Sequence, residues 1–274
     1  MSPESPWTAV RVDGISQREA VARALFEAGS QGVHEDGTSL VTHYPPEFDV
    51  TRVRAAIAAA DRSARVTVSN APVMDWSQWR AAVRAHRLGK LSIVPPWLAD
   101  PADPAQVVID PAMAFGTGEH ATTRGVVRLM QRLPHMPPAV ADLGAGSAVL
   151  AICAARLGAT KVVAIELDPD AIGNAGENVK VNGVDGVVHV IEGDAAVLLP
   201  LIAPVGLVLA NIISSVLLEL LPLMHHSLPH RGFAILSGIL VEEKEKMLDA
   251  LAGDWSVLST DTEEGWWSVL IERQ

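Results

Sequence analysis

The sequence predicts an α/β protein whose larger domain holds a seven-stranded, mostly parallel sheet closed by a terminal antiparallel hairpin, preceded by a small α+β domain. Strand and helix patterns alternate from residue 139 to residue 251, as in a doubly wound sheet. The last two predicted strands, 255–259 and 266–271, have too few residues between them for the helix of a parallel crossover. The first 70 residues follow a different order of strands and helices, which is typical of a compact α+β domain.

The composition is that of a globular chain large enough for two domains. Of its 274 residues, 49% are hydrophobic and 19% are charged, which excludes a disordered chain. The formal net charge of -11 argues against a general affinity for nucleic-acid phosphates, so no direct nucleic-acid binding is expected. An acidic surface suits a lysine-rich protein partner, although solubility alone explains it equally well.

Cysteine usage and the absence of targeting patterns predict a cytoplasmic protein. Cys153 is the one cysteine and cannot form an internal disulfide, which favours a reducing compartment. The N-terminus lacks the basic, apolar and small-residue succession of a signal peptide. Residues 195–218 are uncharged and long enough to raise the question of a membrane span, but Pro200, Pro204 and Asn211 interrupt them. We interpret this stretch as a loop, a buried strand and the start of a helix.

The N-terminal residues 1–70 predict a ferredoxin-like domain. Ser16 and Glu19 have the spacing of a capping box at the start of a helix, and Asp36-Gly37 is a typical hairpin turn. The order of elements, strand–helix–strand–strand–helix–strand, is that of the split βαβ fold, which carries no function by itself. The predicted strands are 7–12, 31–35, 38–44 and 65–68, and the second helix is 50–60.

Residues 71–89 predict a helical linker between the domains. Residues 75–86 have helical character, with Trp76 and Trp79 on one side. Strands at 91–94 and 106–109 then begin the second domain, 90–274.

Residues 139–168 form the first informative stretch, half of a nucleotide-binding βαβ unit. A buried strand ends at Asp142, and Gly144 and Gly146 allow a sharp turn and close ligand approach at a helix N-terminus. Glu166 ends the next strand, close to the spacing at which an acidic side chain reaches ribose hydroxyls. The third glycine of the dinucleotide fingerprint is absent at Val149, so an ordinary tight turn stays open on the glycines alone.

Residues 110–123 form a second glycine-rich stretch. Gly116 and Gly118 flank Thr117, and Thr122 or Thr123 can cap a helix at 124–133. A glycine turn with a buried aromatic residue would explain this stretch in isolation. Two glycine turns in one domain, each just before a helix, favour a shared ligand.

Two polar residues follow later strands of the predicted sheet. Asp194 follows the strand at 187–191, and Asn211 follows the strand at 207–210. The remaining elements are helices at 171–181, 212–220 and 242–251 and a strand at 232–236. A nicotinamide dehydrogenase would continue with parallel βαβ units, whereas a parallel sheet closed by a hairpin is typical of S-adenosylmethionine-dependent methyltransferases.

Five motifs resemble, in order, those of the ribosomal protein L11 methyltransferase family. They are D-P-A-M-A-F-G-T-G-E-H-A-T-T, A-D-L-G-A-G-S-A-V-L-A-I, I-E-L-D-P, V-L-A-N-I-I and L-S-G-I-L. The resemblance covers nearly the whole chain, and the F-G-T-G-x-H-x-T-T element is the most specific of the five. It implies S-adenosylmethionine as cofactor and methylation of lysine side chains, with the N-terminal amine as a further acceptor, on ribosomal protein L11. The N-terminal domain is implied to recognise that protein.

The resemblance also implies roles for individual residues. Asp142 would hold the glycine turn or the methionyl ammonium, Glu166 the ribose hydroxyls and Asp194 the adenine amino group, although helix capping would also explain either aspartate. Asn211 can accept an amine N–H through its side-chain oxygen and is the first candidate for positioning the acceptor, with Thr117 second. His120 can relay a proton or make a structural hydrogen bond. The implied cofactor-binding residues are Phe115, Gly116, Thr117, Gly118, Asp142, Gly144, Gly146, Glu166, Asp194 and Asn211.

Two departures from the family pattern leave alternatives open. Ala148 and Ala121 stand where the family usually has glycine and proline, although alanine needs little room at a helix start. The same chemistry on another protein or a small amine, or cofactor binding without turnover, therefore remain alternatives, with a dehydrogenase third. No metal is implied, because His225, His226 and His230 do not have the spacing of a usual zinc site. A monomer is expected.

Overall fold

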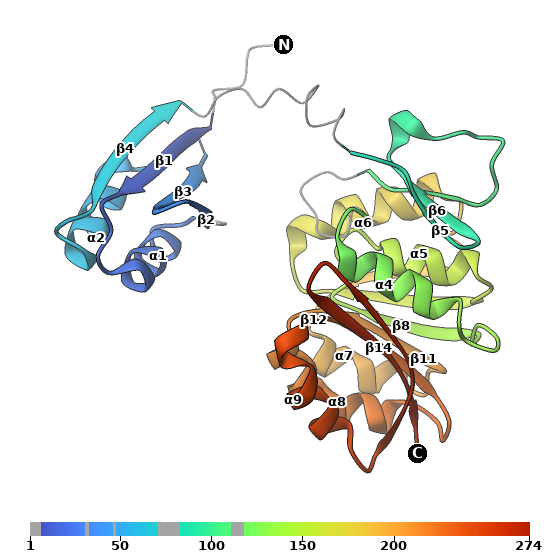
Figure 1. The fold of residues 1–274 in the computed structure, drawn as a ribbon. Helices are drawn as coiled ribbons and strands as arrows, with labels where there is room; N and C mark the ends of the chain where they lie inside the picture. Colours follow the sequence, from blue (N-terminus) through green and yellow to red (C-terminus); the bar gives the residue numbers. More distant parts are fainter. Residues whose placement is uncertain (1–6, 31–32, 46–47, 71–82, 111–117) are drawn as a thin grey trace. The chain divides into compact units, whose positions relative to one another are not determined.

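The computed structural model describes residues 7–30, 33–45, 48–70, 83–110 and 118–274. The chain divides into two compact units, Met1–Ala82 and Val83–Gln274 (Figure 1). The predictions for Phe115, Gly116 and Thr117 and for most of the helix at 75–86 fall outside the described residues.

The first unit is a four-stranded antiparallel sheet with two helices. The strand order is β2-β3-β1-β4, which is the ferredoxin-like order that the alternation in the sequence predicts. Alternate residues of the strands, such as Val10, Val12 and Leu40, are buried against Leu25 and Ile57 of the helices. The elements are β1 (Thr8–Asp13), α1 (Arg18–Glu27), β2 (Val33–Asp36), β3 (Ser39–Tyr44), α2 (Val50–Ala60) and β4 (Arg65–Asn70).

The N-cap of α1 is Gln17 and not the Ser16 of the predicted capping box, and Ser16 is held by a carboxylate from another part of the unit. Asp61 accepts hydrogen bonds from the backbone N–H groups of Ser16 and Gln17 at 2.5 and 2.7 Å, while Gln17, the N-cap residue, makes no side-chain cap. These bonds and those from Ser63 hold the pKa of the Asp61 carboxyl well below its usual range. A carboxylate 45 positions away from Ser16 thus holds the two residues before the helix, which local spacing does not reveal.

The hairpin β2–β3 forms one residue later than predicted. Asp36 pairs with Ser39, so the two-residue loop is Gly37-Thr38, with Gly37 at a φ of 60°. The left-handed conformation is the one that glycine adopts at no steric cost.

A small three-stranded sheet opens the second unit, in the order β5-β6-β7. Its strands are β5 (His86–Leu88), β6 (Leu91–Val94) and β7 (Gln106–Val108), with a 3-10 turn, η1 (Pro96–Leu98), between the last two. Residues 83–85 are not helical either, so the prediction of a helical linker through residue 89 is wrong from residue 83, where the described part of that range begins. Gly89, at a φ of 64°, makes a tight hairpin that pairs Leu88 with Leu91.

The large sheet has seven strands in the order β10-β9-β8-β11-β12-β14-β13. Every strand of this sheet is described, and β14 alone runs antiparallel to its two neighbours, which confirms the predicted closing hairpin. The chain builds the sheet outward from β8 to β10 and then returns to the other side of β8 with β11. The strands are β8 (Ala139–Leu143), β9 (Lys161–Glu166), β10 (Val188–Glu192), β11 (Leu207–Asn211), β12 (Phe233–Leu240), β13 (Trp255–Glu263) and β14 (Trp266–Arg273).

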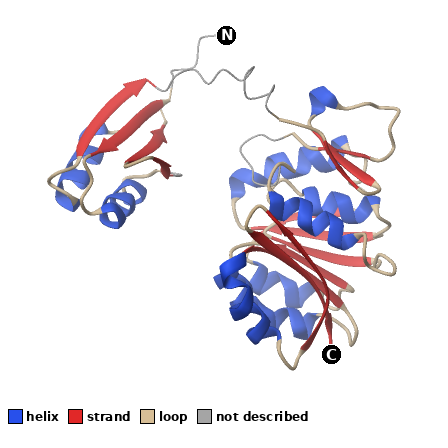
Figure 2. Cartoon of the chain, in the orientation of Figure 1, coloured by secondary structure: helices blue, strands red, loops and turns tan. Residues whose placement is uncertain are grey.

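Helices cover both faces of the large sheet and make two hydrophobic cores (Figure 2). One face carries α4 (Ala121–Met130), α5 (Val149–Arg156) and α6 (Pro169–Val181), and the other α7 (Ala195–Ile202), α8 (Ser214–Ser227) and α9 (Lys244–Leu251), which follows a 3-10 turn, η2 (Val241–Glu243). Residues 195–202, predicted as a loop, are the helix α7, because Asp194 accepts a hydrogen bond from the Ala196 N–H at 2.8 Å and caps its start. None of the described helices is long and apolar enough to cross a membrane.

Candidate functional site

The candidate site lies where the carboxyl ends of four parallel strands meet. Leu143 of β8 pairs with Ile165 of β9 on one side and with Ala210 of β11 on the other, and Asn211 pairs with Ser237 of β12. The strand order reverses between β8 and β11, and ligands of open α/β sheets bind at such a switch point. The strand ends therefore bring Glu166 and Asn211 to one edge of the sheet.

The turn between β8 and α5 is shaped by left-handed backbone and held by Glu166. Gly144 and Gly146 have φ values of 68° and 52°. The Glu166 carboxylate accepts hydrogen bonds from the Gly146 N–H at 2.7 Å and from the Leu167 and Asp168 N–H groups at 2.8 and 2.9 Å. These bonds fix the carboxylate beside the glycine turn, where the spacing predicts a ribose contact.

Ala148 introduces strain into the same turn. Its φ of 63° places it in the left-handed region as the N-cap of α5, and it is completely buried. An L-residue there costs on the order of 1 kcal/mol relative to glycine. The expectation that alanine is tolerated at a helix start on grounds of volume misses this cost, which lies in the backbone conformation.

Asp142 is a buried carboxyl group beneath the turn. Its Oδ2 accepts a hydrogen bond from the Ala151 N–H of α5 at 3.0 Å, whereas its Oδ1 has no partner among the described residues. Complete burial, with the nearby charge of Glu166 as a lesser cause, raises the pKa of Asp142 to about 7. The hydrogen bond ties the Asp142 side chain to the first turn of α5.

Asp194 lies beyond the next strand end, exposed, and caps α7 with one carboxylate oxygen. Its neighbour Gly193 donates a backbone hydrogen bond to the Glu166 carbonyl at 2.8 Å, so the end of β10 is tied to the end of β9. Asp194 is therefore on the same edge as Glu166, and its capping role is the alternative that the sequence left open.

Asn211 ends β11, and the next residue, Ile212, packs between two glycines. A Cβ on Gly144 would lie 2.6 Å from Ile212 Cγ2, and one on Gly238, at a φ of 83°, would lie 2.3 Å from the Ile212 carbonyl oxygen. The Asn211 amide donates from Nδ2 to Thr123 Oγ1 at 3.5 Å, a long contact. Sequence reasoning used Gly238 only as part of a motif, although a glycine inside a strand signals close backbone approach.

The described end of the second glycine-rich stretch contains Gly118, Glu119 and His120. Gly118 is buried at a φ of 89°, where a Cβ would lie 2.6 Å from Ile93 Cγ2 of β6. His120 is the N-cap of α4, in place of the predicted Thr122 or Thr123, because its Nδ1 accepts from the Thr122 N–H at 3.4 Å and lies 2.7 Å from the Thr122 hydroxyl.

His120 is poorly suited to carry a charge. Burial, with the neighbouring Arg124 cation, lowers the pKa of its imidazole, and the ring meets Trp266 edge-on with centroids 5.0 Å apart. A neutral, hydrogen-bonded ring at a helix start favours the structural interpretation of His120 over the proton relay.

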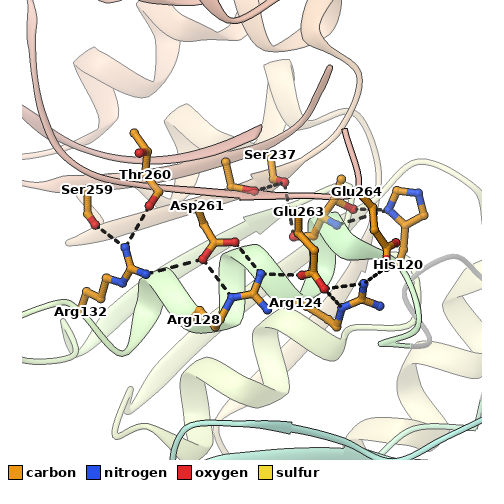
Figure 3. Close-up of polar contacts among 12 residues, drawn as sticks. His120, Arg124, Arg128, Arg132, Ser237, Ser259, Thr260, Asp261, Glu263 and Glu264 are labelled. Atoms are coloured by element: carbon orange, nitrogen blue, oxygen red, sulfur yellow. Dashed lines mark hydrogen bonds and ion pairs between the residues drawn. The ribbon is translucent and has the colours of Figure 1, made fainter. Parts of the chain in front are cut away.

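Two arginines of α4 and a third just beyond its end, four positions apart, hold the helix against the terminal hairpin (Figure 3). Arg124 contacts Glu263 at 2.8 Å and Glu264 at 3.1 Å. The other two reach further along β13, where Arg128 contacts Asp261 and Glu263 and Arg132 donates to Ser259 and Thr260. The hairpin thereby fixes α4, and the N-terminus of α4 lies at the end of the glycine-rich stretch that contains Gly118. No local pattern in the sequence pairs these residues, which lie more than 120 positions apart.

Comparison with known proteins gives one consistent family. The family model described as "Ribosomal protein L11 methyltransferase (PrmA)" matches residues 7–274. Relatives of that name include one from Pelobacter propionicus, 37% identical over 219 residues, 77% of this chain and 70% of the relative. Another, from Myxococcus xanthus, is 32% identical over 93% of this chain and 94% of its own length. A solved ribosomal protein L11 methylase from Lactobacillus delbrueckii subsp. bulgaricus superposes with a TM-score of 0.63 at 31% identity, covering 70% of this chain and all of that chain.

The close approach of Ile212 leaves no room for a side chain at position 238. We expect Gly238→Ala to lower the melting temperature of the protein by several degrees, since both the left-handed φ and the 2.3 Å approach oppose a Cβ. Gly173→Ala is the matched control, because a Cβ there meets nothing within 4 Å and alanine stabilises a helix by about 0.5–1 kcal/mol. Calorimetric unfolding measures both; an unchanged melting temperature in Gly238→Ala contradicts the close approach.

Burial of Asp142 makes stability depend on pH with a definite sign. Because its pKa is raised above that of the unfolded chain, the protein without ligand loses stability as pH rises from about 4 to about 7. Asp142→Asn removes this loss, so the stability difference between variant and wild type shifts toward the variant by up to about 4 kcal/mol over that range. Unfolding of both proteins across the pH range measures the difference, and a difference that stays constant with pH disproves the raised pKa.

Proposed function

The chain belongs to the ribosomal protein L11 methyltransferase family, and from this we propose that it transfers methyl groups from S-adenosylmethionine to ribosomal protein L11. The acceptors we propose are lysine side chains, with the N-terminal amine as a further acceptor. The proposal rests on the family match over residues 7–274. The structure supports it, because the glycine turn, Glu166 and Asn211 lie at the same edge of the sheet.

The residues at this edge fit S-adenosylmethionine. The turn is left-handed at Gly144 and Gly146, Glu166 is fixed beside it, and the buried Asp142 Oδ1 has no partner among the described residues. When bound, the cofactor supplies a methyl group on a positively charged sulfur, which leaves without help from an acid. The protein therefore has mainly to bind, to exclude water and to align an amine.

We assign roles in cofactor binding from position. Glu166 binds the ribose hydroxyls, and Asp194 binds the adenine amino group with the oxygen that does not cap α7. Asp142 faces the methionyl ammonium, whose positive charge favours the ionised carboxylate and offsets the cost of burial. The backbone of Gly144 and Gly146 would contact the cofactor. The sequence motif assigns Phe115, Gly116, Thr117 and Gly118 to the methionine end, where they would contact the cofactor.

Asn211 positions the acceptor amine. A free lysine amine has a pKa near 10.4 and is mostly protonated at neutral pH, so the site has to favour the neutral form by desolvation. With Nδ2 directed to Thr123, the Oδ1 of Asn211 is the atom that accepts an amine N–H, which orients the nitrogen lone pair away from Asn211. Thr117 is the second candidate for this role. His120 serves as the cap of α4 and takes no proton.

We propose that residues 1–70 recognise the substrate protein and that the methyltransferase domain begins with the second unit at Val83. The net charge of -11 supports a lysine-rich partner, since opposite charges speed encounter and steer orientation. Modification of a ribosomal protein is consistent with the cytoplasm, and we propose that the protein acts there as a monomer.

A transfer assay tests the proposed function. The protein is incubated with labelled S-adenosylmethionine and either ribosomes or free ribosomal proteins, and the labelled band is identified. We expect label on ribosomal protein L11. Label on a different protein or on a small amine contradicts the substrate. Cofactor binding without transfer supports a protein that has lost turnover, which the strained Ala148 would favour.

Asn211 provides the test of the acceptor site. We expect Asn211→Ala to lower kcat for L11 about a hundredfold while S-adenosylmethionine affinity changes little, because the lost group aligns the amine. Asn211→Asp keeps an acceptor oxygen but adds a charge that raises the pKa of the amine, so its activity recovers only at higher pH. Initial rates as a function of pH, with calorimetric cofactor binding, distinguish the two. Unchanged turnover in Asn211→Ala removes the residue from the mechanism.

A further inference from the structure

Glu119 joins two segments of the second unit that are far apart in sequence. Its Oε1 accepts a hydrogen bond from the Arg84 N–H at 2.9 Å and lies 3.0 Å from Nε2 of His86. Arg84 and His86 belong to the first described segment after residues 71–82, at the point where the chain enters the second unit. The side chain of Glu119 is therefore bound to the entry segment.

The backbone of Glu119 is held from the opposite direction. Its carbonyl accepts a hydrogen bond from Arg124, a residue only 7% exposed, whose guanidinium also contacts Glu263 and Glu264 at the tip of the terminal hairpin. His120, the next residue, caps α4. Glu119 is thus set between the entry segment and the arginine that fixes the N-terminus of α4 to the hairpin.

Strand β6 also contacts both the entry segment and the residues just before α4. His86 of β5 pairs with Ile93 of β6, and Ile93 is the residue against which the backbone of Gly118 packs. A shift of the entry segment would therefore act on Gly118 and Glu119 together. Gly118 is a proposed cofactor-binding residue, so the contact reaches the methyl-donor site.

We propose that Glu119 is a positioning residue, which ties the segment entering from the N-terminal unit to Gly118 and the N-terminus of α4 and so aligns the donor site for transfer to a protein substrate. The inference rests on the proposed function, because it assigns substrate recognition to the first unit. Loss of the Glu119 contacts with Arg84 and His86 leaves the substrate-binding residues of the first unit unchanged, but it allows Gly118 and the N-terminus of α4 to move. The rate of transfer should fall while the apparent affinity for L11 does not.

Kinetics provide the first test. Glu119→Ala removes the acceptor for Arg84, and we expect kcat for L11 to fall at least tenfold with KM changed less than twofold, since small misplacements of reacting groups are costly. Glu119→Gln keeps an oxygen acceptor for the Arg84 N–H and should retain most of kcat. Glu219→Ala, which removes an exposed acid from α8, is the control for lost charge and should match wild type. Unchanged kcat in Glu119→Ala, or a rise in KM without a fall in kcat, overturns the proposal.

Hydrogen exchange provides a second test that needs no substrate. In the full chain, we expect the amides of residues 83–86 and 118–124 to exchange faster in Glu119→Ala and in His86→Ala than in wild type and Glu219→Ala. Exchange at these segments that matches wild type in both variants overturns the proposal. If wild type transfers no methyl group to L11, the proposed function fails, and the exchange result still decides whether Glu119 ties the two segments.

Discussion

The packing of Ile212 between Gly144 and Gly238 is the constraint on which the rest of the site depends. A Cβ at either glycine would come within 2.6 Å of Ile212, so the turn after β8, the loop after β11 and the bend in β12 can meet only while both positions lack a side chain. This close approach places Asn211 beside the glycine turn. Its own polar contact, 3.5 Å to Thr123, is too long to do so. Backbone packing therefore sets the geometry of the site.

The terminal hairpin is part of the functional architecture as well as the end of the sheet. Because β14 lies between β12 and β13, the tip of the hairpin reaches α4, where Glu263 and Asp261 receive the arginines of that helix. Arg128 donates hydrogen bonds to Asp261 and Glu263, which raise the pKa of its guanidinium, so the arginine keeps its positive charge. Several partly buried charges joined in one network hold a helix better than isolated surface pairs.

Two carboxylates near the turn serve different ends because their surroundings differ. Glu166 accepts three backbone hydrogen bonds, which fix the position of its carboxylate beside the glycine turn. Asp142 is completely buried with one unsatisfied oxygen, so in the free protein its charge is costly. The left-handed Ala148 and the buried Asp142 carboxyl both lower the stability of the folded protein at this turn. Such local costs are common at binding sites.

The sequence by itself determined the fold class and the strand ends that carry the site, because alternating periodicity and glycine turns are local properties. It also predicted that Glu166 ends the strand after the glycine turn, since the spacing is that of one βαβ unit. Only the tertiary structure decided which residues meet across the chain. Asp61 binds the backbone of Ser16 before α1, Asp261 accepts hydrogen bonds from Arg128, and Ile212 contacts Gly238. In each pair, the packing of sheets and helices determines the partner. A local pattern carries no information about such pairs, because their separation in the chain is bridged only when the core forms.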